Sequence, residues 1–111
     1  IGVLNAMRTL HLTVTREPFE VMATGEKKLE YRKPSEWILS RLRHPFGYDV
    51  VKITNGYGAD KPYFLAKYLG YTVAGVGYTQ TYSNGLNVQV SKGDIRIHLG
   101  QVLETGTNQT S

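Results

Sequence analysis

The order of apolar and polar residues along the chain predicts short strands joined by short helices. Residues 8–15 alternate between aliphatic side chains and threonine or histidine, which is typical of a strand with one solvated face. Residues 17–24 fit a brief amphipathic helix, in which Pro18 is tolerated in the first turn. Gly25 fits the left-handed position that follows a helix C-terminus, and residues 28–32 then alternate again as a second strand.

Proline and glycine divide the middle of the chain. Pro34 ends the second strand because it has no N–H for the ladder, and Ser35 is a good N-cap for a helix over residues 35–43. A run rich in β-branched residues at 49–54 predicts a third strand. It is followed by a loop at 55–62, which contains an Asn-Gly pair, a second glycine and a proline.

The last third of the chain is rich in β-forming residues. Residues 63–73 predict a long strand, with Gly70 at a bulge or a sharp bend. Residues 74–87 are rich in glycine, threonine, tyrosine, serine and asparagine, and we expect either a hairpin tip or a mobile loop. Two further strands are expected at 88–90 and 95–103, on either side of a tight turn.

The predicted order is strand, helix, strand, helix and then four strands. Because there are no long crossover helices, this order argues against a parallel doubly wound sheet. We expect an α+β fold, with a mainly antiparallel, partly closed β-barrel and two short helices, since closure removes unprotected edges. The 111 residues fit one domain, which we place at 8–104, with a leader or added segment at 1–6 before Met7 and a frayed polar tail at 105–111.

The composition excludes some kinds of chemical site but says less about where the protein is located in the cell. The chain has no cysteine, which excludes disulfides and thiolate metal sites. Its net charge of +4 is compatible with a polyanionic partner such as RNA, and its eight tyrosines fit either a sheet surface or a surface on which bases stack. No apolar run approaches the length of a membrane span and no signal peptide is visible, so we expect a cytoplasmic protein without a membrane partner.

Most familiar catalytic patterns are absent from the sequence. The three histidines, His11, His44 and His98, lie on different predicted elements without metal-ligand spacing, so we expect no metal and no cofactor. The glycines after Asn55 are not followed by a helix whose N-terminus could bind phosphate. The candidate chemistry therefore lies in the charged stretch after Gly25.

Lys27, Glu30 and Arg32 are the candidates in this stretch, although a neutral ion-pair ladder on a solvated strand would give the same pattern. As a site, the two cations would contact phosphate or a base edge, and Glu30 would accept hydrogen bonds from a base or hold Arg32 in place. In a regular strand Lys27 and Glu30 face opposite sides, so they converge only if Lys27 still belongs to the corner after Gly25. The predicted companions in ligand binding are Asn55, Tyr57, Lys61 and Tyr63.

The stretch from Gly25 to Arg32 has the pattern G-x-K-x-x-E-x-R, which resembles the signature of the ASCH domain, a branch of the PUA-like superfamily. The flanking order is also similar to that of small single-domain members from phages and bacteria, across residues 8–104. The similar segments are the opening strand, the short helix, Ile53-Thr54-Asn55-Gly56-Tyr57, Pro62-Tyr63-Phe64 and Ile97-His98-Leu99-Gly100.

This resemblance implies a PUA-like barrel with a cleft lined by the motif and a role in binding RNA or modified nucleosides. Some relatives are enzymes: one branch hydrolyses acetylated cytidine, and another is reported as a ribonuclease. In the amidohydrolase branch the motif lysine, which Lys27 matches, is catalytic and is assisted by a threonine three residues on and by a separate glutamate. Glu30 stands at the threonine position and the separate glutamate has no clear counterpart, so this sequence departs from that branch.

The residues and the resemblance leave three functions open. The leading hypothesis is an RNA- or nucleotide-binding module with a basic cleft, in which Tyr57 and Tyr63 stack on a base. The first alternative is a metal-independent ribonuclease or a nucleoside amidohydrolase, with Lys27 as the base, Tyr57 as acid or oxyanion donor and Glu30 beside them. The second alternative is a phage protein that binds a host protein through residues 74–87.

Overall fold

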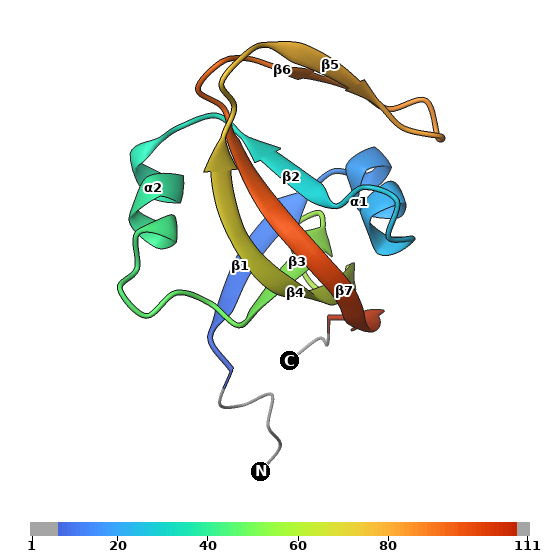
Figure 1. Cartoon of the computed structure of the whole chain (residues 1–111). Helices are drawn as coiled ribbons and strands as arrows, with labels where there is room; N and C mark the ends of the chain where they lie inside the picture. The colour runs from blue at the N-terminus through green and yellow to red at the C-terminus, as the bar shows by residue number, and fades with distance from the viewer. Residues whose placement is uncertain (1–6, 109–111) are drawn as a thin grey trace.

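The computed structural model describes residues 7–108, and the predicted leader at 1–6 and the last three residues of the chain lie outside the described residues. The described part contains two helices and seven strands (Figure 1). In chain order they are β1 (Thr9–Val14), α1 (Arg16–Ala23), β2 (Leu29–Arg32), α2 (Glu36–Leu42), β3 (Val50–Asn55), β4 (Pro62–Val73), β5 (Tyr78–Thr81), β6 (Asn87–Val90) and β7 (Ile95–Thr107).

Five strands form one curled sheet in the order β1-β3-β4-β7-β2. In this sheet the β1–β3 pair is parallel, and the other three pairs are antiparallel. The prediction of an α+β fold with two short helices and a mainly antiparallel, partly closed barrel is therefore confirmed at this level. Strands β5 and β6 pair with each other and form a hairpin that arches over β2 (Figure 1).

The two edge strands of the curled sheet, β1 and β2, are connected by a side chain. The Arg32 guanidinium of β2 donates a hydrogen bond of 2.8 Å to the Thr13 carbonyl of β1. We call this side of the half-barrel, between β1 and β2, the seam. Since no backbone ladder joins β1 to β2 within residues 7–108, groups at the seam are available for contacts that a closed barrel would not allow.

Aliphatic residues from alternate positions of the strands fill the half-barrel. Leu10, Ile53 and Ile97 are almost completely buried, and the helices add Met22 and Ile38 to the same cluster. Complete burial of one such side chain stabilises the fold by about 1.5–3 kcal/mol. This core holds β1 and β2 in place on either side of the seam.

The corner between α1 and β2 has the predicted geometry. Gly25 follows the helix cap with a φ of +87°, and its N–H donates to the Met22 carbonyl at 3.0 Å. The Lys27 N–H then donates to the Val21 carbonyl at 3.0 Å, so the chain folds back against the helix before β2 begins. Ser35 caps α2 as predicted, because its hydroxyl accepts from the Ile38 N–H at 3.3 Å.

The C-terminal prediction is wrong for part of the tail. Instead of fraying from Thr105, β7 continues to Thr107, which pairs with Pro62 at the start of β4. Asn108 continues the contact, since its N–H donates to the Lys61 carbonyl at 2.8 Å. The polar side chains of this tail gave no apolar pattern to detect, but a ladder is stabilised by backbone N–H and C=O groups, which the residues of the tail possess whatever their side chains.

Two other segments of the C-terminal half have the structure that the sequence predicts. The long antiparallel pair of β4 with β7 is irregular between Tyr68 and Tyr71, where Gly70 has a φ of +97° and forms the predicted bulge. Residues 74–87 adopt the hairpin alternative, because they contain β5 and the turn that leads to β6.

Replacing Gly106 with alanine is expected to destabilise the fold by about 1–3 kcal/mol. An added Cβ would lie 2.8 Å from the Tyr63 hydroxyl oxygen and 2.9 Å from two carbons of its ring, so the ring would have to leave its place on β7. That shift would also break the 2.7 Å hydrogen bond from Tyr63 to Glu104. Urea denaturation measures the change, with Gly75→Ala as the control because no described atom lies within 4 Å of a Cβ there. Equal stabilities of the two variants would contradict this packing.

Candidate functional site

Lys27 is buried at the corner between α1 and β2. The residue is 2% exposed, and its ammonium group donates to the Leu29 carbonyl. The same ammonium lies 3.4 Å from a Glu30 carboxylate oxygen. Because β2 begins only at Leu29, the alternation of a strand does not apply to Lys27, and the condition for its convergence with Glu30 is met.

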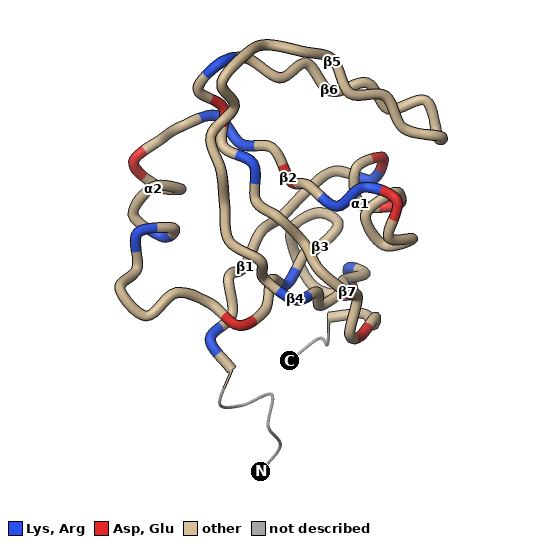
Figure 2. The backbone as a smooth tube through the Cα atoms, viewed as in Figure 1, with Lys and Arg blue, Asp and Glu red and all other residues tan. Residues whose placement is uncertain are grey.

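Glu30 and Arg32 point into the half-barrel from β2. In the ladder they lie opposite Ile97 and Ile95 of β7, which are core residues. Glu30 is 6% exposed, and its second carboxylate oxygen accepts from the Arg32 Nε at 2.9 Å. One carboxylate is thus held between two cations, so the three side chains carry a net charge of +1. Figure 2 shows an acidic position at β2 with basic positions on either side of it along the backbone.

These side chains line a cavity of about 300 Å³ at the seam, which we call the Lys27 pocket. This volume is at the lower end of the range of small-molecule sites. Its walls come from the end of β1, the start of α1, β2 and the hairpin. The lining residues are Thr13, Val14, Thr15, Pro18, Lys27, Glu30, Tyr31, Arg32 and Val88.

Two tyrosine rings flank the Lys27 ammonium. The Tyr31 ring centroid is 5.0 Å from the nitrogen and the Tyr82 centroid is 5.7 Å from it, within the range of cation–π attraction. Burial raises the pKa of Tyr31, and the neighbouring hydroxyls of Tyr78 and Tyr82 raise this pKa further. Arg96 donates to the Tyr78 hydroxyl at 3.3 Å from the other side.

Sequence reasoning missed these three tyrosines as site residues. Tyr31 lies inside the motif, and Tyr78 and Tyr82 are four residues apart, which places them on one side of an extended strand. The even spacing was a usable signal. The spacing alone does not predict that the hairpin folds back over β2.

Burial lowers the pKa of Lys27, and this effect outweighs the opposing attraction of Glu30. A buried ammonium costs free energy in the folded state, and it loses its proton more easily than a solvated lysine. Titratable groups whose pKa is shifted by burial and by a specific charged partner cluster at functional sites.

The predicted companions from the β3–β4 region do not line the Lys27 pocket. Tyr57 is 84% exposed, and Tyr63 is turned toward Glu104 with the Lys52 ammonium 4.4 Å from its ring centroid. Asn55 pairs with Val14 at the end of β3, and Lys61 lies beyond it in the connection to β4. The reason is the strand order: β1 separates β3 and β4 from the seam.

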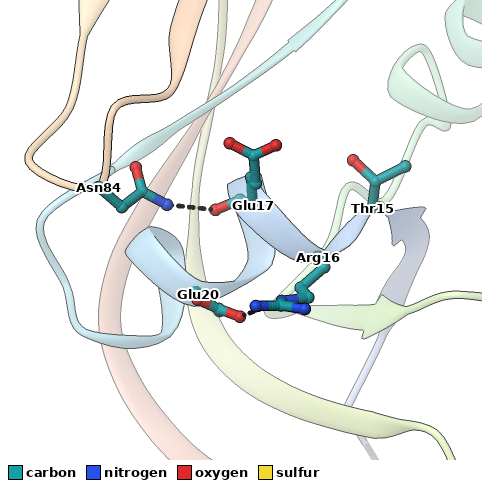
Figure 3. A pocket seen from close by; sticks show the side chains of 5 residues that line it. All are labelled: Thr15, Arg16, Glu17, Glu20 and Asn84. Carbon is teal, nitrogen blue, oxygen red and sulfur yellow. Dashed lines mark hydrogen bonds and ion pairs between the residues drawn. The ribbon is translucent and has the colours of Figure 1, made fainter.

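A second, larger cavity of about 510 Å³ lies between the start of α1 and the hairpin tip (Figure 3). Thr15 lines both cavities, and Asn84 of the hairpin donates to the Glu17 carbonyl at 3.1 Å. The ion pair of Arg16 with Glu20 in this cavity is solvent-exposed, so it contributes little to the stability of the fold. The buried ion pair of Lys27 with Glu30 lines the smaller Lys27 pocket, which is therefore the candidate site.

Within residues 7–108, no group of three or more histidine, aspartate or glutamate side chains is placed to hold a metal ion. None of the helices described is long and apolar enough to cross a membrane. No family model, curated protein or solved structure matches the chain. The function is therefore inferred from the Lys27 pocket itself.

Proposed function

We propose that this chain is a PUA-like module of the ASCH type that binds RNA or a nucleotide in the Lys27 pocket. The observation that carries the proposal is the buried ammonium of Lys27, held against Glu30 beside two tyrosine rings in a cavity. A charge buried at such cost and lining a cavity favours a ligand-binding role over a purely structural one.

The charges of the pocket suit a phosphate or an electron-rich base edge. The Arg32 Nε donates to Glu30, and one terminal nitrogen donates to the Thr13 carbonyl. The remaining guanidinium hydrogens are available to a ligand. Lys27 adds a second cation on the other side of the same carboxylate. Glu30 accepts from both cations, which supports a role in positioning them.

The aromatic contribution in this proposal comes from Tyr82, in place of the Tyr57 and Tyr63 that the sequence favoured. Tyr82→Ala is expected to weaken RNA binding by ~1–3 kcal/mol, the usual value of one stacked base. Tyr57→Ala is the matched control, because this ring is 84% exposed in the loop after β3, whereas the Tyr82 ring lies beside the Lys27 ammonium, so the loss of Tyr57 should leave the affinity unchanged. Titration of both variants with the same RNA compares the two rings, and an equal loss would place the ligand elsewhere.

Fluorescence anisotropy with short labelled RNAs over a series of salt concentrations tests the proposal. If the pocket binds phosphate, affinity should fall as salt rises, and unlabelled nucleoside monophosphates should compete. Lys27→Met should lose affinity, whereas Lys28→Met, which removes the same charge from an exposed neighbour, should retain most of it. The proposal would be overturned if the affinity for RNA did not change with salt concentration and was equal in Lys27→Met and Lys28→Met.

The lowered pKa of Lys27 favours one second candidate, a hydrolase that uses the same pocket. A lysine that loses its proton below the usual pH can act as a general base on a nucleoside amide or on RNA. Tyr57 has no part in such a mechanism, because it lies outside the pocket. Incubation with acetylcytidine and with labelled RNA tests this candidate, and turnover should rise with pH as Lys27 deprotonates and should be absent from Lys27→Met.

A further inference from the structure

The β5–β6 hairpin forms one wall of the Lys27 pocket without belonging to the main sheet. Val88 of β6 lines the pocket, and the Tyr82 ring lies beside the Lys27 ammonium. Strands β5 and β6 make a separate two-stranded sheet, so no ladder among the described strands fixes them to β2 or β7. The hairpin therefore covers the pocket through side chains.

The base of the hairpin is firmly held. The Ala74 N–H donates to the Asp94 carbonyl and the Gly93 N–H donates to the Ala74 carbonyl, both at 2.8 Å. The buried Asp94 carboxylate accepts from Lys33 at 2.7 Å, which ties this base to the end of β2. Movement of the hairpin has to occur beyond this point.

The stem that follows the base contains a glycine suited to a hinge. Gly75 has no described atom within 4 Å of the place where a Cβ would be, so the space around it is open. Gly77 follows two residues later, where a Cβ would lie 3.3 Å from the Val90 carbonyl oxygen, so this glycine is packed against β6 and belongs to the hairpin. Glycine has the widest range of backbone angles, which allows the stem to rotate at low cost.

The tip of the hairpin is held by a few exposed hydrogen bonds. The Ser83 N–H donates to a Glu26 carboxylate oxygen at 2.7 Å, and the Ser83 hydroxyl donates to the other oxygen. Asn84 adds the bond to the Glu17 carbonyl that Figure 3 shows. Glu26 lies in the same corner as Lys27, so the tip is fastened directly beside the candidate site.

We propose that the β5–β6 hairpin is a strap that opens and closes over the Lys27 pocket, with Glu26 as its latch. The strap would open by rotation at Gly75 and would close on a bound ligand through Tyr82. The Tyr82 ring of the strap lies 5.7 Å from the Lys27 ammonium, beside the Tyr31 ring of β2, and this contact supports the closed position. The identity of the ligand rests on the proposed function, but the motion of the strap does not.

Thiol labelling measures the opening without any ligand. The chain has no cysteine, so Val88→Cys supplies a single thiol on the strap itself, at the wall that it contributes to the pocket. Adding Glu26→Ala should speed its labelling by a small thiol reagent about tenfold, which corresponds to a latch worth ~1.4 kcal/mol. Glu17→Ala is the matched control, since Asn84 binds the main-chain carbonyl of Glu17 and this bond survives.

A second thiol position guards against a local effect of the cysteine. Thr13→Cys lies on the opposite wall of the pocket, and it should give the same ratio of labelling rates. Ser83→Ala, which removes one of the two latch bonds, should give an intermediate rate. Equal labelling in the Glu26→Ala and Glu17→Ala backgrounds at both positions would overturn the strap.

The labelled RNA of the binding assay then tests whether the strap controls the site. Its dissociation should be about tenfold faster from Glu26→Ala than from the parent chain. Unchanged dissociation would show that the strap does not gate the pocket. Faster labelling in a chain that binds no RNA would support the strap and would instead contradict the proposed function.

Discussion

Replacing Lys27 with methionine is expected to remove most of the RNA affinity while leaving the protein as stable as before or more stable. A hydrogen bond from this ammonium to the ligand is charge-assisted and worth ~1.5–3 kcal/mol, or about 10- to 100-fold in affinity. Stability should behave in the opposite way. The folded state must bury the ammonium, whereas methionine fills a similar volume without this cost, and Glu30 keeps its 2.9 Å contact with Arg32.

The pH dependence of stability provides an independent measure of the same cost. Because the pKa of Lys27 is lowered in the folded state, the unfolded chain holds this proton more tightly, so Lys27 opposes folding at neutral pH. The penalty disappears as pH rises through the folded pKa toward the value of a solvated lysine. The stability of the parent chain should therefore approach that of Lys27→Met as pH rises from neutral toward the ordinary pKa of lysine.

Thermal unfolding of both chains over this pH range, beside RNA titrations, tests the expectation. Lys28→Met is the control, because its lysine is exposed and should affect neither quantity strongly. A Lys27→Met variant that is much less stable than the parent would mean that the lysine is mainly a structural group. Loss of RNA binding would then reflect the damaged fold rather than a ligand contact.

Replacing Glu30 with alanine is expected to destabilise the fold by ~3–5 kcal/mol, the typical result of removing one partner from a buried ion pair. Glu30 is the only carboxylate in ion-pair contact with Lys27 or Arg32 among the residues described, so its loss leaves two cations at the seam without a counter-charge. Arg32 can turn toward solvent, but Lys27 is enclosed. The cost should therefore arise mainly from Lys27.

A double-mutant cycle assigns this cost. In urea denaturation, Glu30→Ala combined with Lys27→Met should recover a large part of the stability that Glu30→Ala alone loses. Glu30→Gln, which keeps the shape and one acceptor, should fall between the parent and Glu30→Ala. Glu36→Ala removes an exposed carboxylate, so its effect on stability measures the loss of one negative charge without a buried ion pair. If Glu30→Ala costs no more than Glu36→Ala, the buried ion pairs have little energetic role.

The local features of the fold were predictable because their causes are local. Gly25 ends α1 with a positive φ, and Ser35 caps α2, since glycine and serine have these preferences whatever the rest of the chain does. The meeting of Lys27 with Glu30 followed from the same corner. The sequence showed that the two side chains converge only if Lys27 lies before the regular strand, and β2 does begin after it, at Leu29.

The remaining features depend on which strands become neighbours, and local pattern carries no such information. The loop after β3 looks like a site because it combines Asn55 with Tyr57, but β1 lies between it and the seam. Conversely, Tyr82 is far from Lys27 in sequence and reaches it only because the hairpin folds back. The same limit explains the tail, where β7 pairs with β4 although its polar residues show no apolar pattern.

Within the described chain, the half-barrel leaves β1 and β2 as sheet edges, and such edges invite strands of neighbouring molecules to add to the sheet. Natural sheets prevent this addition with charged side chains that point inward at the edge. Glu30 and Arg32 are charges of this kind on β2, and Arg32 also occupies an edge carbonyl of β1. The residues that line the Lys27 pocket thus also protect the open sheet against aggregation, so a chain whose motif was made entirely apolar is expected to lose solubility.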